Sequence, residues 1–267
     1  MFKTFTPFTP FTPLPTAGWR LSVQRLLRTL CLAAPAWLGA GWAQADMVID
    51  TTRVIYPEAR REVSFKVTNV SKDKPAFVQM WLDDGNAAAA PEDSVTPFNL
   101  TPPIARLKSD SGQVVRLTYT GEPLPSDRES VFWFNMLELP QRSNEENKLS
   151  FAVRTRIKVF FRPKALRGDP AALYSQVQWK VLKQGDNWVA EGTNPTPYHM
   201  SFFSVGLGQS GSYDLTVDGG MVAPMGKVTI VLGEVSKINK PFNQIKVEYI
   251  TDYGGANPIE IAVNAAP

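Results

Sequence analysis

The chain has 267 residues, 43% of them hydrophobic, which is enough to build one large domain or two of ordinary size. The first 45 residues hold four of the 28 basic side chains and none of the 25 acidic ones, so the remainder is close to neutral. A nearly neutral remainder gives no argument for binding nucleic acid. The 22 prolines and 18 glycines are spread along the chain, as expected for many short strands joined by turns.

Residues 1–45 have the order of a secretory signal peptide with a low-complexity extension. Three arginines precede the uncharged stretch 29–42, and the small-residue sequence Ala-Gln-Ala ends at Ala45. The uncharged stretch is short for a membrane span, so we expect cleavage after Ala45 and no membrane insertion of the mature chain; an uncleaved anchor is the alternative. The Phe-Thr-Pro repeat at 5–13 cannot build a core. The one cysteine, Cys31, lies in this leader, so the exported protein would fold without disulfides.

Short runs of alternating apolar and polar residues follow one another after the leader. Turn-forming residues separate them, and no convincing helical period interrupts them. This spacing predicts an all-β fold, with one immunoglobulin-like sandwich over residues 46–166. The strands expected there include 47–56, 62–70, 76–83, 113–119 and 131–139.

The stretch 149–163 predicts one unusually long strand with two different faces. Alternate residues of a strand point to opposite faces of the sheet. The cationic face holds Arg154, Arg156, Lys158 and Arg162. The other face is an almost continuous apolar row of Leu149, Phe151, Val153, Thr155, Ile157, Val159 and Phe161.

A second β domain is predicted over residues 167–267. The Arg-Gly-Asp-Pro sequence at 167–170 favours a linker turn, and its resemblance to an adhesion tripeptide is too short to carry weight. Further alternating runs then continue to the end of the chain, including 175–185, 200–208, 227–233 and 245–255. Two β domains joined by a short linker should form an angled pair with an interdomain cleft.

The sequence gives no argument for catalysis, so we expect no enzyme, no cofactor and no metal. Its one histidine, His199, and the absence of cysteine after the leader leave no material for a histidine-rich metal site or a Cys–His pair. No phosphate-binding loop or dinucleotide fingerprint is present. The turn at 83–86 lacks the acidic spacing of a calcium loop. A pair of carboxylates for hydrolysis stays open, because such groups meet in space rather than in sequence.

The sequence LPSDRESVFWFNMLELP at 124–140 resembles the signature of the immunoglobulin-like periplasmic pilus (fimbrial) assembly chaperones. Four further stretches agree in the same order along the chain: 52–58, 155–163, 194–202 and 251–255. The resemblance implies two immunoglobulin-like domains in an L or boomerang arrangement with a cleft. The short segment 140–147 is similar to that of the short-loop branch of the family.

This resemblance implies a function for the long strand. A family member acts in the periplasm without ATP, caps a pilus subunit whose own sandwich lacks a strand, and delivers it to an outer-membrane usher. By motif position Leu149, Phe151 and Val153 would fill the groove of the subunit. The row from Ile157 to Phe161 would belong to the domain's own core; the alternative is that the whole row is core.

The resemblance also assigns two sets of charged residues. Arg53 and Lys158 match the pair that anchors the C-terminal carboxylate of the subunit. Glu129, Arg162 and Asp252 match an interdomain salt-bridge network. Without the resemblance, all five would be ordinary surface charges.

Two other classes of protein stay open at this point. The chain could be a fimbrial subunit, or a secreted or surface two-domain immunoglobulin-like binding module. A subunit would need an incomplete sandwich and commonly a disulfide, whereas two complete domains without mature cysteine are predicted here. The sequence also leaves open whether the free protein self-associates to cover its apolar strand.

Overall fold

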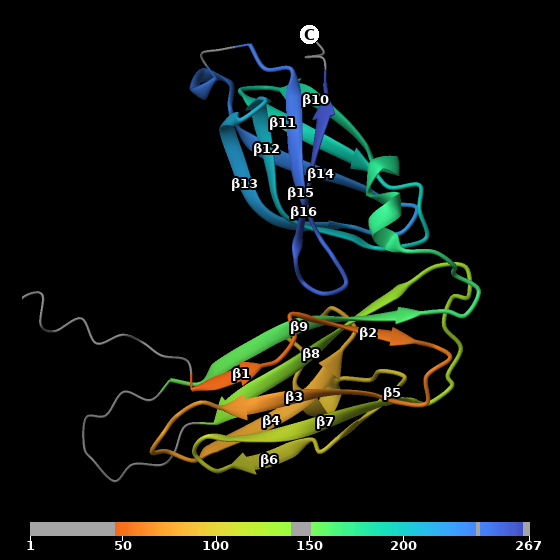
Figure 1. Cartoon of the computed structure of the whole chain (residues 1–267), viewed down its shortest axis with the longest axis vertical. Coiled ribbons are helices and arrows are strands. Elements are labelled where there is room, and N and C mark those ends of the chain that lie inside the picture. Colours follow the sequence, from red (N-terminus) through yellow and green to blue (C-terminus); the bar gives the residue numbers. More distant parts are fainter. Residues whose placement is uncertain (1–45, 140–150, 239–240, 264–267) are drawn as a thin grey trace, which may run out of the picture. The chain divides into compact units, whose positions relative to one another are not determined.

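A computed structural model of the chain describes residues 46–139, 151–238 and 241–263 (Figure 1). In these ranges the structure is nearly all β, with four sheets and three short 3-10 helices. The helices are η1 (Pro91–Asp93), η2 (Pro170–Gln176) and η3 (Val235–Lys237). The predicted all-β class is confirmed.

The first two sheets pack into one sandwich. The four-stranded sheet has the order β1 (Met47–Ile49), β3 (Val63–Asn69), β7 (Ser111–Tyr119) and β5 (Phe98–Thr101). The five-stranded sheet has the order β2 (Arg53–Pro57), β9 (Val153–Arg162), β8 (Ser130–Leu139), β4 (Ala76–Asp83) and β6 (Ile104–Leu107). Both sheets contribute side chains to a shared core, with fully buried Val67 and Leu117 from one and Phe134 and Val159 from the other.

The other two sheets form a second sandwich. The three-stranded sheet has the order β10 (Gln178–Gln184), β11 (Asn187–Thr193) and β14 (Lys227–Glu234). The four-stranded sheet has the order β13 (Ser212–Val222), β12 (Met200–Gln209), β15 (Gln244–Ile250) and β16 (Ala256–Ala262). Their core is separate and includes Met200, Phe202 and Ile245. The aromatic rings of Tyr174 and Tyr249 stack there at 4.6 Å.

The prediction of a single strand over 47–56 is wrong. The chain leaves the first sheet after Ile49 and enters the opposite sheet at Arg53. Between them the Thr51 hydroxyl donates a hydrogen bond of 2.6 Å to the Arg53 carbonyl, a local side-chain contact that competes with strand pairing. This crossing places Arg53 at the start of β2, beside β9.

The last two residues of the expected linker at 167–170 belong to the start of helix η2. Asp169 caps η2, because its Oδ1 accepts a hydrogen bond of 2.9 Å from the Ala171 amide. Pro170 is the first residue of that helix and is buried. The Arg-Gly-Asp sequence therefore helps to start η2, and the Asp169 carboxylate already accepts a hydrogen bond within the chain.

Candidate functional site

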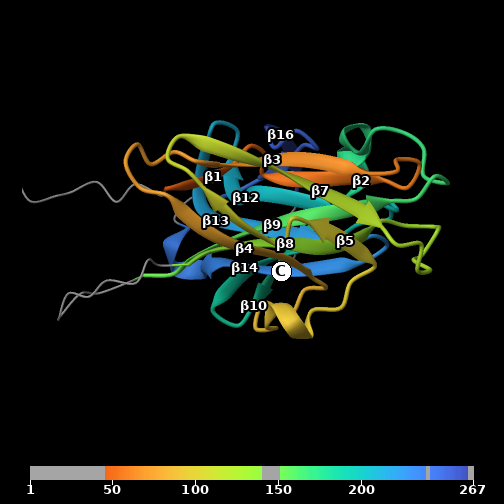
Figure 2. The same ribbon diagram turned by 90° about the horizontal axis from the view of Figure 1, so that it is seen from below.

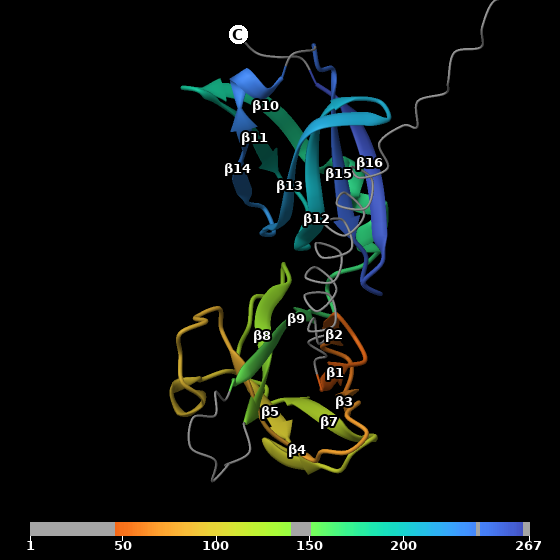
Figure 3. The same ribbon diagram turned by 90° about the vertical axis from the view of Figure 1, so that its left-hand side faces the viewer.

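Strand β9 is paired along its whole length on one edge and along only half on the other. Strand β8 pairs with it from Val153 to Phe161. Strand β2 runs parallel to it and pairs only from Lys158 to Arg162. Figure 2 and Figure 3 show β9 next to β8 from two directions. In the part of the chain that the structure describes, no strand covers the second edge between Val153 and Ile157, so backbone groups there are open to an added strand.

The apolar row of β9 passes from the core into solvent along this open half. Val159 and Phe161 are fully buried, which confirms their predicted place in the core, and Ile157 is half-buried against it. Val153, the first residue of β9, is 50% exposed, and Phe151, which lies two residues before the strand and not in it as predicted, is 73% exposed. Leu149, the third predicted groove residue, lies outside the described residues. Large exposed apolar side chains beside an unpaired edge are typical of a surface that binds another chain.

Two cations lie side by side where the open half ends. Arg53 and Lys158 are direct register partners at the first pair of the β2–β9 ladder. Arg53 is buried, its Nη1 donates to the Ile250 carbonyl at 3.2 Å, and its Cζ lies 5.7 Å from the centre of the Phe160 ring. Its Nε is buried and finds no acceptor among the described residues.

The charges of this pair are not compensated locally. Burial lowers the pKa of Arg53, and electrostatic interactions with Tyr174, Asp252 and Glu129 oppose that effect only in part. Burial also lowers the pKa of Lys158, and the charge of Arg53 lowers it further. Within the described ranges no carboxylate comes within ion-pair distance of either cation. Two adjacent, partly desolvated cations of this kind favour the binding of an anion.

The three residues predicted as a salt-bridge network are brought together by the structure. Arg162 Nε donates to Glu129 Oε1 at 2.9 Å, and its two terminal nitrogens donate to the Asp252 carboxylate at 2.8 and 3.1 Å. Burial alone would lower the pKa of Arg162, but hydrogen bonds and charges from Asp252 and Glu129 outweigh it and raise that pKa. Glu129 and Arg162 come from the first sandwich, and Asp252 follows β15 of the second.

A fourth member of the network, His199, is not predicted by the sequence. Its backbone amide donates to Glu129 Oε2 at 2.9 Å, and its ring Nδ1 lies 3.3 Å from the same oxygen. The ring also packs on Phe160, with 5.5 Å between ring centres. A lone histidine beside a strand start carries no sequence signal for such a partner 70 residues away.

Replacing Arg162 with alanine is expected to destabilise the protein by about 3–5 kcal/mol, because it leaves the buried Glu129 carboxylate without its cation. Urea unfolding followed by tryptophan fluorescence measures the change. Arg128→Ala is the matched control, since the Asp127–Arg128 ion pair is exposed to solvent and its loss should leave the unfolding curve almost unchanged. Equal losses for the two variants would contradict a structural role of the network.

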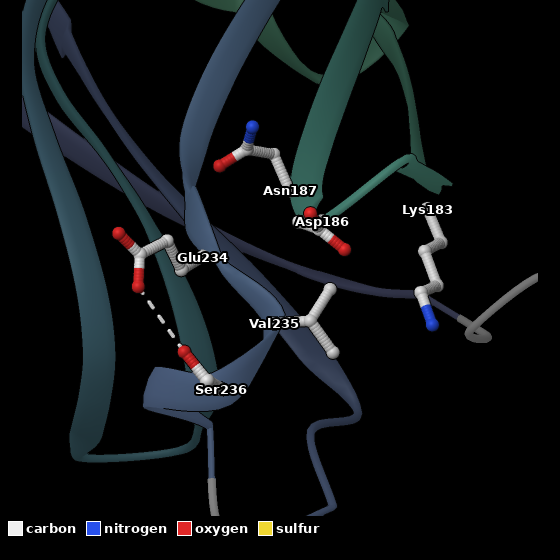
Figure 4. A pocket seen from close by; sticks show the side chains of 6 residues that line it. All are labelled: Lys183, Asp186, Asn187, Glu234, Val235 and Ser236. Atoms are coloured by element: carbon white, nitrogen blue, oxygen red, sulfur yellow. Dashed lines mark hydrogen bonds between the residues drawn. The ribbon is translucent and has the colours of Figure 1, made fainter.

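The structure offers little for metal or small-molecule chemistry in the ranges described. It contains no group of three or more histidine, cysteine or acidic residues placed to hold a metal. None of its described helices has the length and hydropathy that crossing a membrane requires. An open surface hollow of about 660 Å³ lies by the β10–β11 turn (Figure 4). Its lining includes Glu234, hydrogen-bonded to Ser236 at 3.1 Å, and none of the residues predicted for the site.

These features define a class: a two-sandwich, immunoglobulin-like protein with an open strand edge beside a pair of partly desolvated cations. The chain belongs to the pilus assembly chaperone family. Residues 46–167 match the N-terminal domain of the pili and flagellar-assembly chaperone PapD, and residues 172–261 match the C-terminal domain of that pili assembly chaperone. The family role is that of a chaperone and not of an enzyme. The short-loop assignment depends on 140–147, which lies outside the described residues.

Individual relatives agree over most of their length. The chaperone protein FimB/FhaD of Bordetella pertussis is 37% identical over 83% of this chain and 89% of its own. The chaperone protein PapD of Escherichia coli is 30% identical over 90% and 95%. The crystal structure of the YadV chaperone superposes with a TM-score of 0.67 at 37% identity, covering 82% of this chain and all of that one. The SafB chaperone of Salmonella enterica, solved with the SafA pilin, gives 0.67 at 25% identity, over 83% and 98%.

Proposed function

We propose that this chain is an ATP-independent periplasmic chaperone that caps pilus subunits by donor-strand complementation and hands them to an outer-membrane usher. The observation that carries the proposal is β9 itself. Its apolar row leaves the core at the point where its edge loses β2, so an unpaired backbone and exposed side chains coincide. An incomplete sandwich needs both of these from its donor.

Alternation of the row assigns Phe151 and Val153 to the groove of the subunit, with Leu149 continuing the row. Each would contribute roughly 1.5–3 kcal/mol on burial before ordering costs are deducted. A shift of register by one residue would turn all three away from the groove. The complex therefore needs a fixed starting point.

The cation pair supplies that starting point and a direction. A subunit strand running parallel to β9 along the open half would end near Lys158, with its C-terminal carboxylate beside Arg53 and Lys158. A strand running the opposite way would place its amino end there, so its C-terminal carboxylate would not reach the two cations. Charge thus favours the parallel orientation, and charge-assisted hydrogen bonds would hold the carboxylate.

Three further points belong to the same proposal. Residues 1–45 act as the export leader, residues 46–166 form the subunit-binding domain, and residues 167–267 form the second domain. The Glu129–Arg162–Asp252 network fixes the two domains against each other. The complex between SafB and the SafA pilin supports a subunit as the partner.

Co-purification tests the proposal. The tagged mature chain, recovered from the periplasm of a piliated host, should carry a pilus subunit in a one-to-one complex. Adding ATP should not release it. Entry of the chain itself into fibres would instead identify a fimbrial subunit, and recovery of the chain alone from a host that assembles pili would favour a surface binding module.

A further inference from the structure

The cationic face of β9 carries a network that neither the sequence motifs nor the proposed function explains. It lies on the face of the sheet opposite to the apolar row. Cross-strand register brings Trp81 and Arg156 to either side of Asn135, and Asp83 opposite Trp133. The two arginines of the open half of β9, Arg154 and Arg156, reach across this face toward β8 and β4.

Asp83 is the centre of the network. It is fully buried at the end of β4. Its carboxylate accepts hydrogen bonds from Arg156 Nε at 3.1 Å, from Arg156 Nη2, from Asn135 Nδ2 at 2.7 Å and from the Gly85 amide at 2.8 Å. Burial would raise the pKa of Asp83, but the hydrogen bonds from Arg156 and Asn135 outweigh it and lower the pKa. The buried carboxylate is therefore stabilised in its ionised form, and both of its oxygens accept hydrogen bonds.

Arg154, two residues before Arg156 on the same face of β9, also belongs to the network. Its Nε and Nη2 donate to Asn135 Oδ1 at 3.0 and 2.7 Å, and its Nη1 donates to the Ala87 carbonyl at 2.6 Å. The Cζ of Arg154 lies 4.8 Å from the centre of the Trp81 ring, and that of Arg156 lies 4.7 Å from the Trp133 ring. Both guanidinium groups are thus fixed by hydrogen bonds in their plane and by an aromatic face.

The position of the network matches the half of β9 that has only one neighbour. From Lys158 onward the strand is held between β8 and β2, whereas Val153–Ile157 is held by β8 alone. An edge segment with one partner strand opens more easily than a central one. Arg154 and Arg156 both belong to this segment, and they tie it to β4 and to the turn after β4.

We propose that Asp83, with Arg154 and Arg156, is a positioning network that keeps the open half of β9 extended and in register before a partner binds. The inference deepens the proposed function and depends on it for the identity of the partner. Because strand side chains alternate, fixing the two arginines on one face also fixes Val153, Thr155 and Ile157 on the other. A donor segment ordered in advance loses less conformational entropy on binding.

Hydrogen exchange of the free protein and capture kinetics test the inference with Asp83→Asn. Asp84→Asn is the matched control, because Asp84 is its exposed neighbour in the same turn, and among the described residues its carboxylate accepts one hydrogen bond, of 3.4 Å from the Asn86 amide. In Asp83→Asn, we expect amide exchange at Val153–Ile157 to accelerate at least about tenfold more than at Val159–Phe161. Capture of the subunit recovered by co-purification should slow about tenfold at equal concentration, and Asp84→Asn should match the wild type in both measurements.

The outcomes separate this inference from the proposed function. Equal acceleration along all of β9, or none, or capture at the wild-type rate by folded Asp83→Asn, would overturn the positioning network and leave the proposed function standing. A wild-type protein that captures no subunit would overturn the proposed function, while the exchange comparison still decides whether the network orders the segment. Should Asp83→Asn not fold, Arg154→Gln tests the same expectation, since it removes the guanidinium contacts to Asn135, Ala87 and Trp81 and the 3.5 Å ion pair with Asp83, and leaves Asp83 its hydrogen bonds from Arg156.

Discussion

The double variant Arg53→Ala/Lys158→Ala is expected to lose subunit capture while it folds as stably as the wild type. Each charge-assisted hydrogen bond to a subunit carboxylate is worth roughly 1.5–3 kcal/mol, so losing both should weaken binding at least about 100-fold. Affinity measured by isothermal titration or biolayer interferometry with the purified subunit gives the comparison. A minimal probe is a synthetic peptide of the subunit's last strand, with a free or an amidated C-terminus.

The expectation that the double variant stays stable follows from the lowered pKa values of Arg53 and Lys158. The folded state lowers the pKa of both basic groups, so it disfavours their charged forms relative to the unfolded chain. While both side chains are protonated, these charges therefore lower the free energy of unfolding, and removing them does not destabilise the fold through electrostatics. The Ile250 carbonyl, which loses the Arg53 donor, keeps the Tyr174 hydroxyl at 3.2 Å.

The control for this variant removes two cations elsewhere in the same domain. Lys66 and Arg116 are exposed on β3 and β7, in the sheet that does not contain β9. Lys66→Ala/Arg116→Ala changes the net charge equally and should bind like the wild type. Unchanged capture by the Arg53/Lys158 variant, or equal binding of free and amidated peptides, would remove the carboxylate anchor from the proposal.

Much of the fold is predictable from alternation, and the errors have a physical cause. Strands such as β3 and β15 have one face in a core, so their apolar residues recur with period two. The crossing of the chain from β1 in one sheet to β2 in the other cannot be predicted in this way, because the alternation of apolar and polar residues continues through it. Strands β5 and β6 are missed as well, because Pro97 precedes β5 and Pro102 and Pro103 separate β5 from β6, so the sequence around them resembles a loop.

The candidate site is less predictable from residues alone. Arg53 and Lys158 meet through a parallel register that no local pattern encodes, and the family resemblance alone paired them. The Ile250 carbonyl that binds Arg53 is backbone, so its residue type carries no signal. Asp83 ends one predicted strand and begins a predicted turn, and neither pattern indicates its buried role, because its partners Arg154 and Arg156 lie more than 70 residues away in sequence.

Placing aspartate at Phe151 or Val153 is expected to abolish capture with little effect on the free protein. Both side chains are largely exposed in the free chain, where surface substitutions usually change stability by less than about 0.5 kcal/mol. In the complex the same positions would enter an apolar groove. Each change forfeits roughly 1.5–3 kcal/mol of burial and adds the larger cost of desolvating a carboxylate without a partner. Affinity should fall more than about 100-fold, measured alongside the melting temperature.

Controls on the same and on another strand make the result specific to the open half of β9. Val159→Asp lies on the same apolar row but in the core, so it should prevent folding. Val231→Asp changes a valine of β14 that is 56% exposed, and it should alter neither folding nor capture. Because these valines share a residue type and a strand context, any difference between them and Val153 reflects the place of Val153 at an unpaired edge. Normal capture by both Phe151→Asp and Val153→Asp would mean that the subunit docks away from β9, since an apolar groove cannot accept either charge.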